Sequence, residues 1–182
     1  MIAVLAIAAR VLKKEYYSKI AAKTTDFISQ NLTFSDGILL ARFRDGEAKY
    51  LAYIDDYAFL VWGLIELHRT TSQEKYLKKA LELTNKMIEL FWDNKNGGFF
   101  FYSNKSEQLI TRPKEIYDGA LPSGNSAATL NLVRLANAAD NKDLLGYVNK
   151  QLSAFAGSIE RHPHIHSFFL LAFLILYSSD IR

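Results

Sequence analysis

The polar segment from Thr111 to Ser126 holds the residues of this chain that are best suited to chemistry. It combines two carboxylates, an arginine, a tyrosine, two prolines and two glycines within sixteen positions. Ordinary connections between helices run to ~2–8 residues and need no such chemistry. Because long ordered loops on a helical scaffold are common places for binding and catalysis, we expect the functional site to include this segment.

Glu115 and Asp118 lie three residues apart in this segment, with Tyr117 between them. Glycoside chemistry uses one protonated acid and one ionised base or nucleophile, ~5–9.5 Å apart. If Asp56 lies beside them, these three carboxylates are the candidate catalytic acids and bases. Arg112 would lower the pKa of a neighbouring carboxylate, and burial would raise it. The alternative is that Arg112 and Glu115 form a salt bridge that only fixes the loop.

Asp55 and Asp56 open an expected helix and align with Ser123 and Gly124 in an internal repeat. Asp, Ser and Asn are preferred residues at helix N-termini, so capping is the main alternative to a role in a site. One carboxylate is enough to cap a helix, which leaves the other free to face a cavity. Aromatic residues at the same rim could stack on sugar faces: Tyr53, Tyr57, Phe101 and Tyr117. The candidate substrate-binding residues are Asp55, Tyr57, Arg112, Tyr117, Ser123 and Asn125.

Two other motifs favour structural interpretations. Ser123 is first a helix cap, since no Gly-x-Ser-x-Gly pattern is present and no histidine is near it in sequence. The alternate histidines between His162 and His166 could bind zinc, but they lie in a proline-interrupted link with only Glu160 nearby. The segment from Asn96 to Gly98 is a turn and not a phosphate-binding loop, because no helix start or Lys-Ser/Thr follows it. We therefore expect no metal and no cofactor.

Composition sets the class of protein. The chain has 182 residues, 49% of them hydrophobic and 23% charged, which is typical of one soluble globular domain spanning residues 1–182. A net charge of +3 from dispersed basic residues is too weak to favour nucleic acid or an anionic membrane. The apolar run from Phe168 to Tyr177 is far shorter than the ~20 residues of a membrane span. With no cysteine in the sequence, a cytoplasmic location is expected.

Apolar residues at three- and four-residue spacing predict helices from Glu15 to Asn31 and from Lys75 to Trp92. Sliding the sequence by sixty residues superposes the first of these helices on the second, and a slide by sixty-eight superposes later ones. The turns Thr70 to Glu74 and Ala139 to Lys142 are short enough to force antiparallel helical hairpins. A repeat of this length is typical of stacked or circular arrays of helix pairs.

Longer connectors with strand character follow the helix pairs. From Gly37 to Tyr50 an Asp-Gly turn between alternating apolar flanks predicts a β-hairpin. The segment from Asn96 to Tyr102 begins a similar excursion that returns near Leu109 and Ile110. We expect both at one rim of an all-α fold of about seven helices in antiparallel pairs, with the first pair clipped and Ser167 to Ser178 left without a partner.

Three motifs in order carry a resemblance to a known family: Tyr53-Ile-Asp-Asp-Tyr-Ala-Phe, Phe91-Trp-Asp-Asn-Lys-Asn-Gly-Gly-Phe-Phe, and Arg112-Pro-Lys-Glu-Ile-Tyr-Asp-Gly-Ala-Leu-Pro-Ser-Gly-Asn-Ser. The chain resembles the C-terminal part of thioredoxin-domain-containing proteins of the spermatogenesis-associated protein 20 type. The resemblance implies a partial (α/α)6 toroid related to six-hairpin glycosidases and sugar epimerases, with rim loops around a carbohydrate-sized cavity. The family's thioredoxin-like domain is absent, and without cysteine no redox centre is expected.

Two functions remain open from the sequence. The first is a six-hairpin glycosidase-like domain with a small carbohydrate ligand, in which Asp56, Glu115 and Asp118 supply acid and base. The second is a non-catalytic interaction or structural module left by truncation of a larger protein. Half of a ring would leave apolar flanks exposed, so we also expect a homodimer through the terminal helices.

Overall fold

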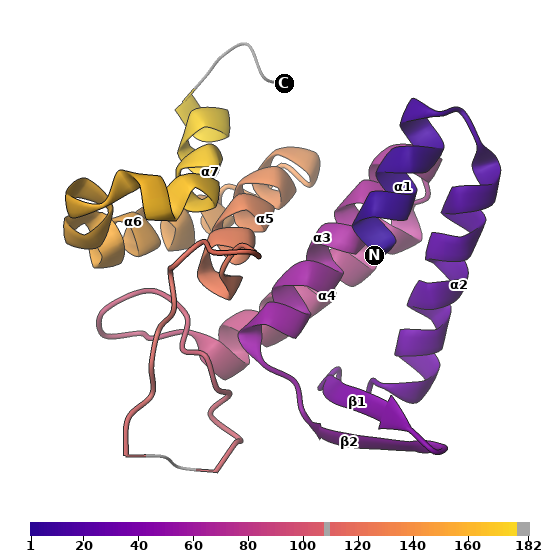
Figure 1. Ribbon diagram of the computed structural model, residues 1–182, viewed down its shortest axis with the longest axis horizontal. Coiled ribbons are helices and arrows are strands. Elements are labelled where there is room, and N and C mark those ends of the chain that lie inside the picture. The colour runs from indigo at the N-terminus through magenta and orange to yellow at the C-terminus, as the bar shows by residue number, and fades with distance from the viewer. Residues whose placement is uncertain (108–109, 178–182) are drawn as a thin grey trace.

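A computed structural model describes residues 1–107 and 110–177 of the chain. Within these residues the chain forms seven α-helices, one short 3-10 helix and one two-stranded sheet (Figure 1). The all-α prediction is thereby confirmed, and the helix from Glu15 to Asn31 has the bounds expected from its periodicity. In chain order the elements are α1 (Ile2–Val11), α2 (Glu15–Asn31), β1 (Leu40–Arg44), β2 (Glu47–Leu51), α3 (Ile54–Thr71), α4 (Glu74–Phe91), α5 (Gly124–Ala138), α6 (Asp143–Arg161), η1 (Pro163–His166) and α7 (Ser167–Tyr177).

The helices form three antiparallel pairs, α1 with α2, α3 with α4 and α5 with α6, followed by α7. Each pair reverses direction within a short turn that contains one non-glycine residue in the left-handed backbone region. These residues are Lys13, Ser72 and Asp140, with φ of 53°, 56° and 47°. A left-handed residue at the turn of every pair is the structural counterpart of the internal repeat.

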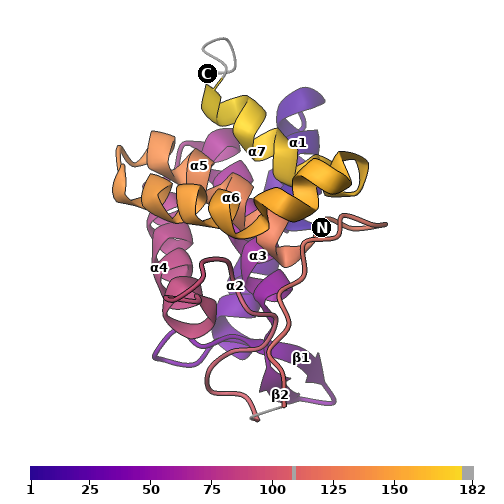
Figure 2. The ribbon, with the colours of Figure 1, turned by 90° about the vertical axis from the view of Figure 1, so that its left-hand side faces the viewer.

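The pairs are arranged in two layers that form an arc (Figures 1 and 2). Helices α1, α3, α5 and α7 pack in succession as the inner layer, and α2, α4 and α6 pack on the outside of their own partners. The main hydrophobic core runs through the inner layer from Ile2 to Ala172. Helix α5 lies between α3, α6 and α7, and most of its side chains are buried, which explains its weak amphipathic pattern.

The β-hairpin was predicted correctly. Strands β1 and β2 pair antiparallel around Asp45 and Gly46, whose φ values of 54° and 80° suit a tight two-residue hairpin turn. It lies at the same end of the molecule as the long loop between α4 and α5 (Figure 1). Both connectors therefore extend from one rim.

The second β-excursion was not predicted correctly. In the described part of loop 93–122 the structure has an isolated bridge between Trp92 and Phe99 and no strand. Backbone groups there are satisfied by other partners, because the Phe101 N–H donates to the Pro113 carbonyl at 2.8 Å and a side chain of α5 bonds to Phe99. The expected return near Leu109 lies outside the described residues. No helix in the described ranges is both long and apolar enough to cross a membrane.

Candidate functional site

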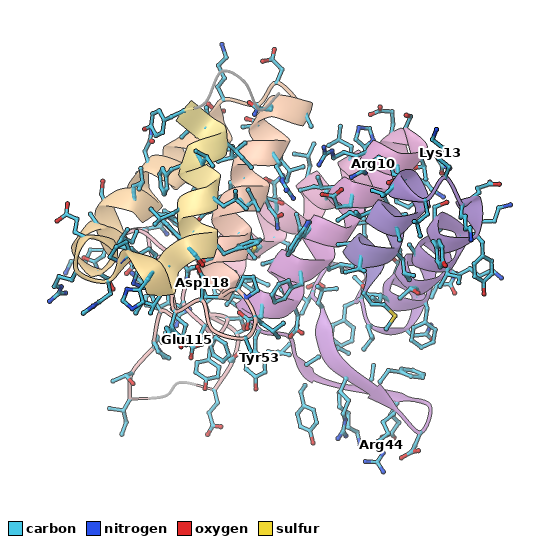
Figure 3. All side chains as sticks on the ribbon, turned by 45° about the horizontal axis from the view of Figure 1, so that its top comes forward. Arg10, Lys13, Arg44, Tyr53, Glu115 and Asp118 are labelled. Atoms are coloured by element: carbon cyan, nitrogen blue, oxygen red, sulfur yellow. The ribbon has the colours of Figure 1, made fainter. Side chains whose placement is uncertain are left out.

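The candidate site lies where the inner helices α3, α5 and α7 begin and the loop 93–122 crosses them. Tyr53, Glu115 and Asp118 are grouped at this end, whereas Arg10 lies near the other end of the helices (Figure 3). Asp55 at the start of α3 interacts electrostatically with Glu115 of the loop, although sixty residues separate them in sequence. The fold thus brings the two predicted acidic motifs to the same rim.

Asp55 is the carboxylate that faces Glu115. Burial raises the pKa of Asp55, and the negative charges of Glu115 and Asp56 raise it further, while a hydrogen bond from the Gly124 N–H opposes the shift. Helices α3 and α5 approach so closely here that a Cβ on Gly124 would meet the carboxylate of Asp55. Glycine is therefore required at the start of α5, and Asp55 is held at the junction of the two helices.

Asp56 takes the capping task that was considered as the alternative to a site role. Its Oδ2 accepts a hydrogen bond from the Tyr53 N–H at 2.9 Å and so satisfies an otherwise free donor at the start of α3. Burial of part of the carboxyl group raises the pKa of Asp56, and this hydrogen bond lowers it. A catalytic role for Asp56 stays a prediction.

Asp118 joins the loop to the starts of two inner helices. Its Oδ1 accepts from the Ser123 N–H at 3.0 Å, and its Oδ2 accepts from the N–H groups of Phe168 and Phe169 at 2.8 and 3.1 Å. Three backbone donors occupy the carboxylate, so Asp118 fixes α5 and α7 relative to the loop. Its catalytic role likewise stays a prediction, and the geometry favours positioning.

The arginine of the loop has a different partner from the one considered. Arg112 donates to the Tyr102 carbonyl at 2.9 Å, and its guanidinium lies 4.0 Å from the centre of the Phe100 ring. Among the ion pairs of the described residues there is none between Arg112 and Glu115, so the salt-bridge alternative is wrong. Glu115 and Tyr117 are both exposed, which leaves their side chains open to a ligand.

The side chains of Asn125 and Tyr57 hold backbone segments of the site in place through hydrogen bonds. The fully buried Asn125 donates to the carbonyls of Phe99 and Glu115 at 3.0 and 2.8 Å and accepts from the Phe99 N–H at 2.8 Å. Tyr57 is 1% exposed and its hydroxyl accepts from the Leu39 N–H at 2.8 Å. Burial raises the pKa of Tyr57 to about 12. Contrary to our expectation for substrate-binding residues, neither side chain has a face open to a ligand.

Ser123 is a helix cap, as its motif predicts. Its Oγ accepts from the Ser126 N–H at 3.1 Å at the start of α5.

An aromatic surface lies beside Asp55 and Asp56, where the rings of Tyr53 and Phe101 stack with centres 5.0 Å apart. Tyr53 is 40% exposed, so this pair offers a flat apolar face next to the carboxylates.

Curated proteins match part of the chain, whereas no protein-family model matches it. The chain is 36% identical to mouse and to human spermatogenesis-associated protein 20 over 112 residues, which is 61% of the chain and 14% of each relative. The chain resembles part of spermatogenesis-associated protein 20. An uncharacterized protein of Caenorhabditis elegans is 37% identical over 117 residues, 64% of the chain and 15% of that protein. The resemblance inferred from the motifs is confirmed, and it spans about one seventh of each relative.

Solved structures show the fold of the chain. A cellobiose 2-epimerase from Spirochaeta thermophila matches 98% of the chain with a TM-score of 0.75 and 15% identity, using 52% of its own length. The cellobiose 2-epimerase of Bacillus thermoamylovorans matches 85% with a TM-score of 0.68 and 18% identity, using 42% of its length. A GH76 α-mannanase from Bacteroides thetaiotaomicron matches 84% with a TM-score of 0.63 and 15% identity, using 37% of its length. The predicted (α/α) toroid fold is confirmed.

Sequence reasoning missed the ion pair that fixes the loop between α4 and α5. Lys114 donates to Asp93 Oδ2 at 2.7 Å and to the Gly97 carbonyl at 2.6 Å, and both charged side chains are largely buried. A lysine flanked by Pro113 and Glu115 gives no local sign of this contact.

His166 of the histidine cluster is buried, with Nδ1 2.9 Å from the Ile116 carbonyl and Nε2 3.0 Å from Ser158 Oγ.

Proposed function

We propose that the rim of this chain binds a carbohydrate, with Asp55 and Glu115 as the pair of carboxylates that faces it. The observation that carries the proposal is the position of Asp55 at the close approach of α3 and α5, where burial and the charge of the exposed Glu115 raise its pKa. An acid of raised pKa beside a second carboxylate is the arrangement that sugar-processing sites use. The epimerases and the mannanase of the same fold act on carbohydrates, which supports this ligand class.

Other rim residues support the pair. The stacked rings of Tyr53 and Phe101 provide a surface for the apolar face of a sugar, and Tyr117 lies exposed on the same loop. Asp118 and Asn125 hold the loop that carries Glu115 against α5 and α7.

A cytoplasmic location, favoured by the lack of cysteine in the sequence, stays a prediction.

Isothermal titration with cellobiose and with a mannobiose tests this function. We expect at least one disaccharide to bind, and Asp55→Asn or Glu115→Gln to weaken binding about tenfold, the loss expected for one hydrogen bond to a charged group. Glu82→Gln on the outer helix α4 is the matched control and should bind as the wild type does. Absence of binding by both disaccharides, or equal binding by all variants, would contradict the proposal.

The free energy of unfolding should distinguish the role of Asp55 from that of Asp56. A raised folded pKa means that ionised Asp55 disfavours the folded state at pH 7, so Asp55→Asn should stabilise the protein by up to about 1 kcal/mol. This gain should shrink as the pH falls through the raised pKa of folded Asp55, and it should be gone below ~4, where the carboxyl group is protonated in both states. Asp56→Ala should instead lower the free energy of unfolding by ~1 kcal/mol because it removes a cap.

We also propose that the terminal helices pair with a second copy of the chain. Val4 and Val11 of α1 are 68% and 69% exposed, and Tyr177 at the end of α7 is 73% exposed. Light scattering after size exclusion should give a dimer at micromolar concentration and a monomer for the double variant Val4→Lys with Val11→Lys. Phe34→Lys, at an exposed position near the rim hairpin, serves as the control. A wild-type monomer at all concentrations would refute this interface.

A further inference from the structure

A buried carboxylate joins three inner helices at the end of the molecule opposite the rim. Glu66 of α3 is 2% exposed. Its Oε2 accepts from Arg10 of α1 at 3.0 Å, and its Oε1 lies 3.4 Å from Nη1 of both Arg69 and Arg134. Arg134 belongs to α5, so these four residues, the Glu66 cluster, link α1, α3 and α5.

The charges of the Glu66 cluster do not balance. Three guanidinium groups face one carboxylate, which leaves an excess of two positive charges (3 − 1 = 2). Burial lowers the pKa of Arg134, Glu66 raises it, and the charges of Arg69 and Arg10 lower it again. Glu66 and Arg134 are largely buried, whereas Arg10 and Arg69 are partly exposed to water, so an anion that reaches the cluster can contact their guanidinium groups. The cluster is therefore short of negative charge.

The three arginines differ in the number and length of the hydrogen bonds that they make. Arg10 uses one nitrogen for Glu66 and the other for Thr70 Oγ1, both at 3.0 Å. Arg69 and Arg134 share a single oxygen of Glu66 at 3.4 Å, a long distance for a hydrogen bond between charged groups. A guanidinium has five N–H donors, so most donors of Arg69 and Arg134 have no partner in the described chain.

A cavity of about 930 Å³ lies beside Arg69 and Arg134, the two arginines whose N–H donors are mostly without partners in the described chain. Arg69 and Arg134 line it, as do His68 and Lys142, and Arg10 does not. Its apolar wall includes Ile65, Leu77, Leu145 and Ile175. The volume is within the range of small-molecule sites, which combine apolar walls with a few polar groups. Cavity, spare donors and excess positive charge coincide at one place.

We propose that this cavity binds a phosphate monoester, with the phosphate group against Arg69 and Arg134 and the organic part against the apolar wall. A phosphate monoester carries close to two negative charges at neutral pH, and the guanidinium groups of Arg69 and Arg134 both line the cavity to meet them. Guanidinium groups bind phosphate through paired N–H donors. Glu74 and Asp140 also line the cavity, and neither pairs with an arginine there, so both oppose the anion and tune its affinity.

Titration with inorganic phosphate at pH 7.5, compared with sodium chloride of equal ionic strength, tests the site. Phosphate should bind in the millimolar range and raise the melting temperature. Arg69→Gln should weaken binding about tenfold or more, as loss of a charge-assisted contact does. This variant should fold because Arg69 is 54% exposed and Glu66 keeps Arg10 and Arg134. Arg44→Gln, on the distant rim hairpin, should leave phosphate binding unchanged.

A second variant should strengthen binding. Asp140→Asn removes a negative charge at the cavity, and asparagine is well suited to the left-handed backbone at this position, so affinity should rise a few-fold with the fold intact. The proposal is overturned if phosphate has no effect beyond that of chloride, or if Arg69→Gln behaves like Arg44→Gln. Equal binding of acetate and phosphate would also overturn it, because the site would then select a carboxylate.

Discussion

Replacing Asn125 with leucine is expected to lower the free energy of unfolding by about 3 kcal/mol or more. The amide of Asn125 satisfies the N–H and carbonyl of Phe99 and the carbonyl of Glu115, and its own donors and acceptor are all used. Leucine fills a similar volume but leaves these backbone groups without partners, and each buried unsatisfied group costs ~1–3 kcal/mol. The loop that carries Glu115 would lose its attachment to α5.

Urea denaturation followed by circular dichroism measures this loss. Asn137→Leu is the matched control, since it makes the same change at an exposed position near the end of α5 and should alter stability by less than ~0.5 kcal/mol. A second effect should follow at the rim: if the disaccharide binding proposed above is observed, Asn125→Leu should weaken it because Glu115 is displaced. Equal stability of the Asn125 and Asn137 variants would show that the amide does not hold the loop.

Removing the charge of Lys114 is the second change with a large expected effect. Lys114→Met leaves the largely buried carboxylate of Asp93 without its cation, and breaking a buried ion pair from one side costs ~3–5 kcal/mol. The double variant Lys114→Met with Asp93→Asn should lose less than the sum of the two single changes. Lys19→Met, from the exposed pair with Glu15, should cost less than ~1 kcal/mol.

The same ion pair should appear in the pH dependence of stability. Burial alone would raise the pKa of Asp93, but hydrogen bonds from Lys114, Asn96 and the Lys95 N–H outweigh it and hold the pKa well below its usual range. A depressed folded pKa means that the stabilisation is present above the unfolded value of ~3.9 and is lost as the pH falls below it. Asp93→Asn should therefore flatten the loss of stability between pH 4 and about pH 2. An unchanged acid profile would exclude Asp93 as its cause.

The helical frame was readable from the sequence because its signals are local. Apolar spacing fixed the bounds of α2, and the Asp45–Gly46 pair predicted the hairpin turn that the structure has. The internal repeat placed the α3–α4 and α5–α6 turns where the chain reverses. The excursion after Phe99 was predicted wrongly because its backbone bonds go to a side chain of α5 and to Pro113, which are distant partners without a sequence pattern.

The candidate site was readable as a region and not residue by residue. Adjacent aspartates in a sequence do not reveal which one caps the helix. In the structure Asp56 accepts the hydrogen bond from the Tyr53 N–H, while Asp55 interacts electrostatically with Glu115. The partnership of Lys114 with Asp93 spans 21 positions. Glu66 lies between Ile65 and Leu67 in a helix, and only the packing of α1 and α5 on α3 surrounds it with arginines.

The two layers of the arc also determine the local charge at each end of the inner helices. Because each helical pair reverses in a short turn, the inner helices run parallel to one another, and their outer partners run the opposite way with opposing peptide dipoles. The inner helices therefore contribute only a local field at their ends, from free N–H groups at the rim and free carbonyl groups at the far end. Side chains oppose this field at both ends, with Asp55, Asp56 and Asp118 at the rim and Arg10, Arg69 and Arg134 opposite. The sugar proposed for the rim is neutral and would feel little of this field, whereas the anion proposed for the far end would depend on the guanidinium groups for its binding.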